Sequence, residues 1–462
     1  MNNRIRKFNN SGVKGSNLKY AYAHNLTPQE LQNITNNYLD IKNNNDSHKT
    51  KNQTAKNQKQ GQQNDLQHFG YPDTNVYIKA KLVSKEEKKF DMIRNSQHNQ
   101  LKLFDQEKYM ESESDCIFSN KNKNNEIYDR LQLKILECLE NKKNYSLFLF
   151  GTSNTGKNHV LLNKQLLECY GNPQLTSAVR DQQGGIIQRA LSDICTHLKT
   201  MNQDDKEVMI SIIGFYQDRV IDLLNLDQNL ESIQKDNLKI KTEENMGISI
   251  EDLIQMSIWS FSEFVSVYRI YSFMKKILKE QIGMHIKTIV IQISVAKVSQ
   301  QKDFIEKIEQ KFTFVKMTNC QQNLENISNL GFCMDSLKKN SNSIPFRQKK
   351  LTFFLKDCLN VQSHVTLFQT VSNQDSLKSQ ISTMQLASQF NKKQMIKKNY
   401  LSDKEFLEQL QKEDQTGSKQ IYQSMQENFL NSSVNHIQDS DRLGQQNKQN
   451  LNNQLKQDSD NI

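Results

Sequence analysis

Tyr145–His159 reads YSLFLFGTSNTGKNH, and this stretch decides the fold of the chain. The apolar run Ser146–Phe150 ends directly in a glycine loop, as a buried strand does. Residues 160–169 follow with the look of a helix. The segment therefore predicts a strand, a loop and a helix in immediate succession.

The loop has the spacing G-x-x-x-x-G-K, with Gly151, Gly156 and Lys157 at the fixed positions. Glycines let the backbone curl so that several N–H groups converge on phosphate oxygens, and the lysine reaches the terminal phosphates. The next residue is usually Ser or Thr, whose hydroxyl binds Mg²⁺, whereas Asn158 is a weaker metal-ligand candidate. A plain loop is the alternative. The predicted phosphate-binding residues are Gly151, Thr152, Ser153, Asn154, Thr155, Gly156, Lys157 and Asn158.

The surrounding chain alternates between strand and helix patterns. Strands are expected at 75–82, 208–213, 288–294 and 312–315, and 126–140 has the apolar spacing of an amphipathic helix. This order predicts an α/β domain with a central sheet.

The ends of the chain differ from its middle in composition. Residues 1–70 and 399–462 are rich in Asn, Gln, Lys, Ser and Asp, so we expect mostly disordered polar tails around one domain at 71–398. In the second tail, Ile421, Met425 and Phe429 form a helical stripe that is too short for a coiled coil.

Charge and cysteine content limit the class of protein. The net charge of +10 favours a polyanionic partner but does not choose among nucleic acid, anionic membrane and an acidic protein lattice. Seven scattered cysteines without a CxxC pair argue against a zinc site or a disulfide framework. No apolar run approaches the ~20 residues of a membrane span, so we expect a soluble intracellular protein.

Five blocks in order resemble the kinesin motor domain. They are Tyr145–His159, Gly185–Ile194, Ser211–Asn225, Ile344–Leu359 and Thr383–Phe390. The resemblance covers about residues 73–398. It implies the P-loop NTPase kinesin motor fold, which is a central mixed β-sheet flanked by helices on both faces. It also implies ATP or ADP as ligand, microtubules (tubulin) as partner, a cytoplasmic, cytoskeletal location and a role in microtubule-based movement. Whether a partner kinesin chain binds is left open, and no membrane or nucleic-acid partner is expected.

The resemblance fails at the residues of the two nucleotide switches. Where the family's first switch reads N-x-x-S-S-R-S-H, this chain has Gln281–His285, and Gly283 takes the arginine position. In the second switch, D-L-A-G-S-E, the aspartate that secures Mg²⁺ is Lys316. The glycine that meets the γ-phosphate is Asn319, and the glutamate partner of the arginine is Gln321. These degenerate positions leave no confident catalytic residue.

Lys316 is the strongest argument against catalysis. A cation beside a divalent metal costs several kcal/mol at ~5 Å and an effective dielectric of ~20, and phosphoryl transfer depends on such electrostatics. Mg²⁺ binding is therefore doubtful. If Lys316 were displaced from the loop, Asp335 or Glu325 could hold the metal instead.

Two further contacts follow from the resemblance. His159 and the pair Lys79 and Lys81 align with residues that meet the adenine base, although solvated lysines on an edge strand are an equal alternative. The candidate microtubule-binding residues are Arg347, Lys349, Lys350 and Lys356, and their alternative is a solvated basic face.

Three functions remain. The chain is an ATP-driven microtubule motor, a non-catalytic pseudo-motor that binds microtubules or a partner without turning over ATP, or a scaffold that binds ATP without splitting it. We predict ATP and microtubule binding with weak or absent hydrolysis.

Overall fold

The computed structural model describes residues 19–22, 71–81, 89, 91–95, 99–104, 109–168, 184–201, 205–226, 238–244, 246–298 and 305–390. The chain divides into a compact unit of residues 1–103 with 111–397 and a second unit of 104–110 with 398–462. The central sheet and the helices that cover it belong to the first unit. The stripe Ile421, Met425 and Phe429 and the tail 399–462 lie outside the described residues.

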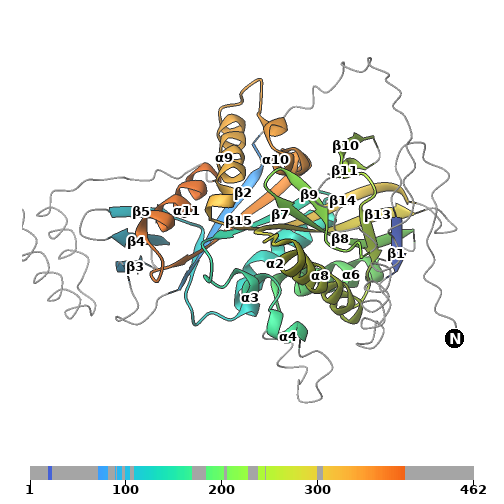
Figure 1. Ribbon diagram of the computed structural model, residues 1–462, viewed down its shortest axis with the longest axis horizontal. Helices are drawn as coiled ribbons and strands as arrows, with labels where there is room; N and C mark the ends of the chain where they lie inside the picture. The colour runs from blue at the N-terminus through green and yellow to red at the C-terminus, as the bar shows by residue number, and fades with distance from the viewer. Residues whose placement is uncertain are drawn as a thin grey trace, which may run out of the picture. The chain divides into compact units, whose positions relative to one another are not determined.

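A mixed ten-stranded sheet forms the centre of the first unit (Figure 1). Its neighbours in order are β1 (Lys19–Tyr22), β12 (Ile254–Ser257), β8 (Lys206–Tyr216), β13 (Thr288–Val298), β14 (Ile305–Thr318), β7 (Asn144–Gly151), β15 (Ser363–Ser372), β2 (Asp73–Lys81) and β6 (Cys116–Phe118), with β9 (Arg219–Asp222) paired to β8. Strands β14, β7, β15, β2 and β6 run parallel, whereas β8, β13 and β14 pair antiparallel. Strand β1 lies within the tail that the sequence predicts to be mostly disordered.

Alternating side chains of the central strands build two cores. On β7, Tyr145, Leu147 and Leu149 pack into one cluster, and Phe148 and Phe150 into the other. The first cluster is covered by α2 (Asn124–Glu140), α3 (Lys157–Leu161), α6 (Ile186–Thr200) and α8 (Phe261–Ile282). The second is covered by α9 (Leu324–Lys338), α10 (Lys350–Phe354) and α11 (Leu377–Phe390) (Figure 1). The sheet thus has helices on both faces, which confirms the predicted fold class.

Smaller elements complete the described part of the chain. A three-stranded sheet joins β3 (Asp91–Asn95), β4 (Gln100–Phe104) and β5 (Tyr109–Glu113), and β10 (Ile240–Glu243) pairs with β11 (Gly247–Ile250). The 3-10 turns η1 (Gln321–Asn323), η2 (Phe346–Gln348) and η3 (Leu355–Cys358) flank α9 and α10. No described helix has both the length and the apolarity needed to cross a membrane.

The expected helix at 160–169 is interrupted. Helix α3 ends at Leu161, and α4 (Lys164–Glu168) begins after Asn163, whose φ is 40°. Asn tolerates this left-handed backbone better than most residues, so it permits a turn inside an apolar helical pattern. Residues of both short helices and of α8 (Phe261–Ile282) line the same cavity, which is described below.

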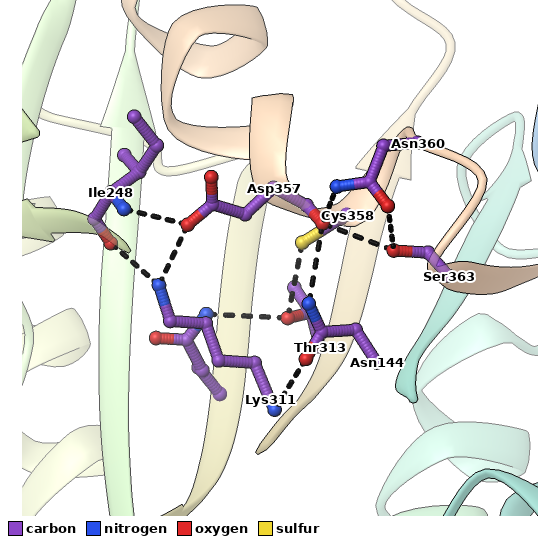
Figure 2. Close-up of polar contacts among 9 residues, drawn as sticks. Asn144, Ile248, Lys311, Thr313, Asp357, Cys358, Asn360 and Ser363 are labelled. Carbon is purple, nitrogen blue, oxygen red and sulfur yellow. Dashed lines mark hydrogen bonds and ion pairs between the residues drawn. The ribbon is translucent and has the colours of Figure 1, made fainter. Parts of the chain in front are cut away.

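An ion pair with a buried lysine joins three segments of the chain, β14, η3 and β11 (Figure 2). The Lys311 ammonium on β14 lies 2.9 Å from the Asp357 carboxylate of η3, and it also donates to the Ile248 carbonyl of β11 at 2.9 Å. The same carboxylate oxygen accepts the Ile248 N–H at 2.6 Å. A Cβ at Gly247 would lie 2.4 Å from that oxygen, so glycine is what lets the β10–β11 hairpin approach. This contact fixes the segment that contains α10 against the sheet.

We expect Asp357→Asn to lower the free energy of unfolding by about 2–3 kcal/mol, because it leaves the Lys311 ammonium, whose side chain is 7% exposed, without its counter-charge. Equilibrium urea unfolding measures the change. The matched control is Glu306→Gln in the exposed Lys297–Glu306 pair, which we expect to cost no more than about 0.5 kcal/mol. Equal costs in the two variants would show that the buried pair is not a stabilising contact.

Candidate functional site

The loop 151–158, called the phosphate loop below, follows the C-terminal end of the central strand β7. Strand β7 pairs in parallel with β14 on one edge and β15 on the other, and Gly151 lies opposite both Thr318 and Thr370. Ligand sites of α/β sheets lie outside the carboxyl ends of such strands. The structure therefore places the predicted loop where the fold favours a binding site.

Both glycines of the loop have geometric reasons to be glycine. A Cβ on Gly151 would lie 2.3 Å from the Thr370 Oγ1 and 2.4 Å from the Thr370 carbonyl oxygen. Gly156, the N-cap of α3, has a φ of 91° and open space around it, so its requirement is conformational. The curl expected from the sequence is thus built from one close backbone approach and one left-handed residue.

Lys157 is folded back onto the loop. Its ammonium donates to the Gly151 carbonyl at 2.9 Å and to the Thr152 carbonyl, and it lies 3.4 Å from the Thr155 hydroxyl. The side chain is buried, and burial lowers the pKa of Lys157 to about 8, an effect that Asp375 partly opposes. A buried ammonium held by carbonyls can move to a stronger acceptor, such as a phosphate oxygen.

Hydrogen bonds to β15 and α11 brace the rear of the loop. The Thr152 hydroxyl donates to Asp375 and accepts from the Gln380 amide at 2.9 Å. The Thr155 and Thr370 hydroxyls lie 2.6 Å apart. The remaining predicted loop contacts, Ser153, Asn154, Gly156, Asn158 and His159, are exposed. The buried half of the loop is therefore rigidly held, and the exposed half faces solvent.

Lys316 lies directly beside the loop. It is on β14, opposite Leu149, and its ammonium donates to the Asn158 Oδ1 at 3.0 Å. Lys316 is 6% exposed, and burial together with Lys275, Lys157 and Lys287 lowers its pKa well below the usual value. The two residues that the resemblance links to Mg²⁺ thus contact each other.

The other residues that the resemblance aligns with the switches have structural contacts of their own. The Asn319 N–H donates to the Gly151 carbonyl at 2.9 Å, and its side-chain amide donates to Ser379 and Thr383 of α11. Gly283 is the left-handed C-cap of α8, with a φ of 64°. Gln321 begins η1 and is exposed.

A cavity of about 1090 Å³ opens between the phosphate loop, α4, α8 and the segment 284–287. Among the described residues, its lining includes eight basic side chains and two acidic ones. The basic residues are Lys157, Lys164, Arg269, Lys275, Lys276, Lys279, Lys287 and Lys316; the acidic ones are Glu168 and Glu280. The α8 lysines and Lys287 were not predicted from the sequence. The run Lys275-Lys276 followed by Lys279 could have indicated a basic helix face.

The residues of this cavity do not fit Mg²⁺. The Lys316 ammonium is hydrogen-bonded to the Asn158 Oδ1, where a metal would bind. The described residues contain no cluster of three or more His, Cys, Asp or Glu side chains suited to a metal. Neither alternative carboxylate lines the cavity, because Glu325 pairs with Lys349 and Asp335 accepts from Gln389. Mg²⁺ is usually held by one or two carboxylates together with substrate phosphates, and the two carboxylates of this lining lie on α4 and α8, where Glu168 is paired with Lys164.

The aligned base-contact residues come near one another. The Lys79 ammonium donates to the Asn122 carbonyl at 3.5 Å, and the His159 carbonyl accepts from the Asn124 amide at 3.0 Å. Burial and the charge of Lys79 lower the pKa of His159. Lys79 and His159 thus each contact the segment 122–124 that begins α2.

The basic segment 347–356 lies on the α9 and α10 face of the sheet. The Arg347 guanidinium is 5.3 Å from the centre of the Phe353 ring and is exposed. Lys349 forms an ion pair with Glu325 of α9, which reduces the charge that the sequence suggests for it. Lys350 and Lys356 are half-buried.

Comparisons with known proteins agree on one family. A family model, the kinesin motor domain, matches residues 27–393. Kinesin-like protein KIF22 of Rattus norvegicus is 23% identical over 322 residues, which cover 64% of this chain and 45% of that protein. Kinesin-like protein KIN-5C of Nicotiana tabacum is 22% identical over 285 residues, which cover 56% of this chain and 27% of that protein. The chain therefore spans less than half the length of these relatives.

A solved structure shares the fold. It is described as "Structure of a fast kinesin: Implications for ATPase mechanism and interactions with microtubules", and it matches with a TM-score of 0.55 at 18% identity. The match covers 69% of this chain and 91% of that chain.

We expect Gly151→Ala to destabilise the domain more than Gly156→Ala. The first change drives a Cβ into the backbone of β15, whereas the second meets open space and costs only the left-handed backbone, about 1–2 kcal/mol. Thermal unfolding of the two variants beside the unchanged protein measures the difference. A smaller loss for Gly151→Ala would mean that the loop can retreat from Thr370.

Proposed function

This chain belongs to the kinesin motor-domain family, and from that premise we propose that it binds ATP or ADP at the phosphate loop and binds microtubules, with weak or absent ATP hydrolysis. The phosphate loop supports nucleotide binding most directly. Gly151 approaches Thr370 too closely for any side chain, and Lys157 is held at the loop by carbonyls that a phosphate can replace.

The contact between Lys316 and Asn158 supports weak hydrolysis. Phosphoryl transfer relies on groups that orient the attacking water and on cations that neutralise the developing charge. Here the Lys316 ammonium donates a hydrogen bond to the Asn158 Oδ1. Asn158 is the loop residue that the family resemblance assigns to the metal. Losing ~4 kcal/mol of transition-state stabilisation would slow turnover about a thousandfold.

A non-catalytic pseudo-motor is the second candidate. In that case the chain binds a microtubule or a protein partner and turns over no ATP. The structure of the switch positions favours this candidate over an active motor, because Asn319 is tied to Gly151 and α11 and Gly283 is committed to ending α8. The two candidates differ in residual ATP turnover.

The candidate microtubule face is the surface around α9 and segment 347–356. Exposed Arg347, with Lys350 and Lys356 beside it, offers positive charge to an acidic lattice. Since Lys349 is paired with Glu325, we assign it a smaller share of the binding. A microtubule partner implies a cytoskeletal location in the cytoplasm. A partner kinesin chain would be an additional requirement for dimeric movement.

We predict a very low basal ATPase that microtubules hardly raise. Steady-state phosphate release from the full chain, with and without microtubules, measures it. Strong microtubule-stimulated turnover would contradict the weak-hydrolysis proposal.

A thermal shift with ADP tests nucleotide binding separately, because a ligand that binds only the folded state raises Tm. Lys157→Met should abolish the shift, whereas Lys143→Met should keep it, since Lys143 is exposed at the opposite end of β7.

The double variant Arg347→Gln with Lys350→Gln should weaken microtubule co-sedimentation about tenfold at low salt and reduce its salt dependence, because screened charge–charge attraction is removed. Lys199→Gln is the matched control, as Lys199 is exposed at the end of α6 on the other face of the sheet. If both variants bind alike, segment 347–356 is not the microtubule face.

A further inference from the structure

We propose that the cavity beside the phosphate loop binds the phosphate chain of its nucleotide through lysine ammonium groups in place of a divalent cation, so that binding needs no Mg²⁺. This inference rests on the proposed nucleotide binding and names how the same site neutralises its ligand.

The charge of the cavity lining is the first argument. Eight basic and two acidic side chains line it within the described part of the chain. Glu168 is already paired with Lys164 at 3.2 Å. No ion pair with a described carboxylate forms at Lys275, Lys287 or Lys316. The cavity therefore holds a positive charge that the described residues do not balance.

The position of Lys316 is the second argument. Its only hydrogen-bond partner among the described residues is the neutral amide oxygen of Asn158, although the side chain is 6% exposed. A buried ammonium normally requires a carboxylate or another anion. Burial, and then the like charges of Lys275, Lys157 and Lys287, lower the pKa of Lys316 well below its usual value. An anion placed among these side chains would relieve this repulsion.

The arrangement of the lysines fits a chain of phosphates. Lys157 comes from α3, Lys275 from α8, Lys287 from the segment before β13, and Lys316 from β14, so ammonium groups reach the cavity from several directions. Each ammonium donates up to three hydrogen bonds, and phosphate oxygens accept them in many geometries. Mg²⁺ is usually held by one or two carboxylates together with the phosphates, and this lining has only two carboxylates against eight basic side chains. Lysines can thus supply the charge neutralisation that a metal supplies elsewhere.

Isothermal titration of the full chain with ADP, once in EDTA and once in excess MgCl₂, tests the inference. We expect ADP to bind in EDTA, and added Mg²⁺ to leave the affinity unchanged or to weaken it, because the metal competes with the lysines for the same oxygens. Tightening of about tenfold or more with Mg²⁺ would overturn the inference.

Variants identify the responsible side chains. Lys287→Met and Lys275→Met should each weaken ADP binding in EDTA about tenfold, and Lys316→Met should do the same if it folds. Lys143→Met, outside the cavity, is the matched control and should bind as the unchanged protein does. Unchanged binding in both Lys287→Met and Lys275→Met would overturn the inference, whatever the stability of Lys316→Met.

Inorganic tripolyphosphate separates this inference from the proposed function. If it competes with ADP in EDTA, the lysines recognise the phosphate chain itself, as we expect. If tripolyphosphate binds but ADP does not, lysine recognition stands and the nucleotide function fails. ADP binding that occurs only with Mg²⁺ leaves the nucleotide function intact and ends the lysine inference. If neither ligand binds under either condition, both fail.

Discussion

Strand β7 is hydrogen-bonded in parallel to β14 and to β15, and this placement governs the chemistry at its C-terminal end. Because Gly151 lies opposite Thr370, there is no room for a side chain at the point where the strand passes into the phosphate loop. The same register sets Lys316 beside Leu149, on the face that α3 and α8 cover. Since side chains alternate along β14, Val315 and Met317 enter the opposite core, and Lys316 can only enter the cavity. A lysine at this position is thus committed to the phosphate site by the pleat of the sheet.

The features that could be predicted from sequence are local in character. Alternating apolar residues predict β2, short apolar runs predict β8, β13 and β14, and the spacing of Gly151, Gly156 and Lys157 predicts the loop, because each pattern depends on neighbours along the chain. The basic wall of the cavity was not predicted, since α8 lies more than a hundred residues from the phosphate loop and meets it only through the sheet. The pairing of Lys349 with Glu325 was missed for the same reason, as it joins two separate elements. The pattern of residues 160–169 predicts one continuous helix and contains no signal for the turn that the structure shows at Asn163.

The proposed site combines a glycine loop of the phosphate-binding pattern with segments that the family resemblance aligns with altered switches. Gly151, Thr152 and Thr155 are held by contacts with β15, α11 and Asp375, so most of the contacts that shape the loop come from outside the segments aligned with the switches. The switch segments are held by different contacts, with Asn319 bound to the Gly151 carbonyl and to α11. Binding and hydrolysis therefore depend on separable sets of residues. A chain can lose the second while keeping the first, because no contact of the loop described above requires a metal or a charged switch pair.

The resemblance aligns Gly283 and Gln321 with the two residues of the family's switch ion pair, and their surroundings explain why a single substitution would not create that pair. Gly283 ends α8 with a φ of 64°, a backbone conformation that costs about 1–2 kcal/mol for a residue with a Cβ. An arginine there would also place a further cation at the edge of a cavity that already has eight basic side chains. A glutamate at Gln321 alone would be exposed and would have no guanidinium to meet. Each single change is unfavourable or without effect until the other is present, so the local packing of α8 and the charge of the cavity together stabilise the altered switch.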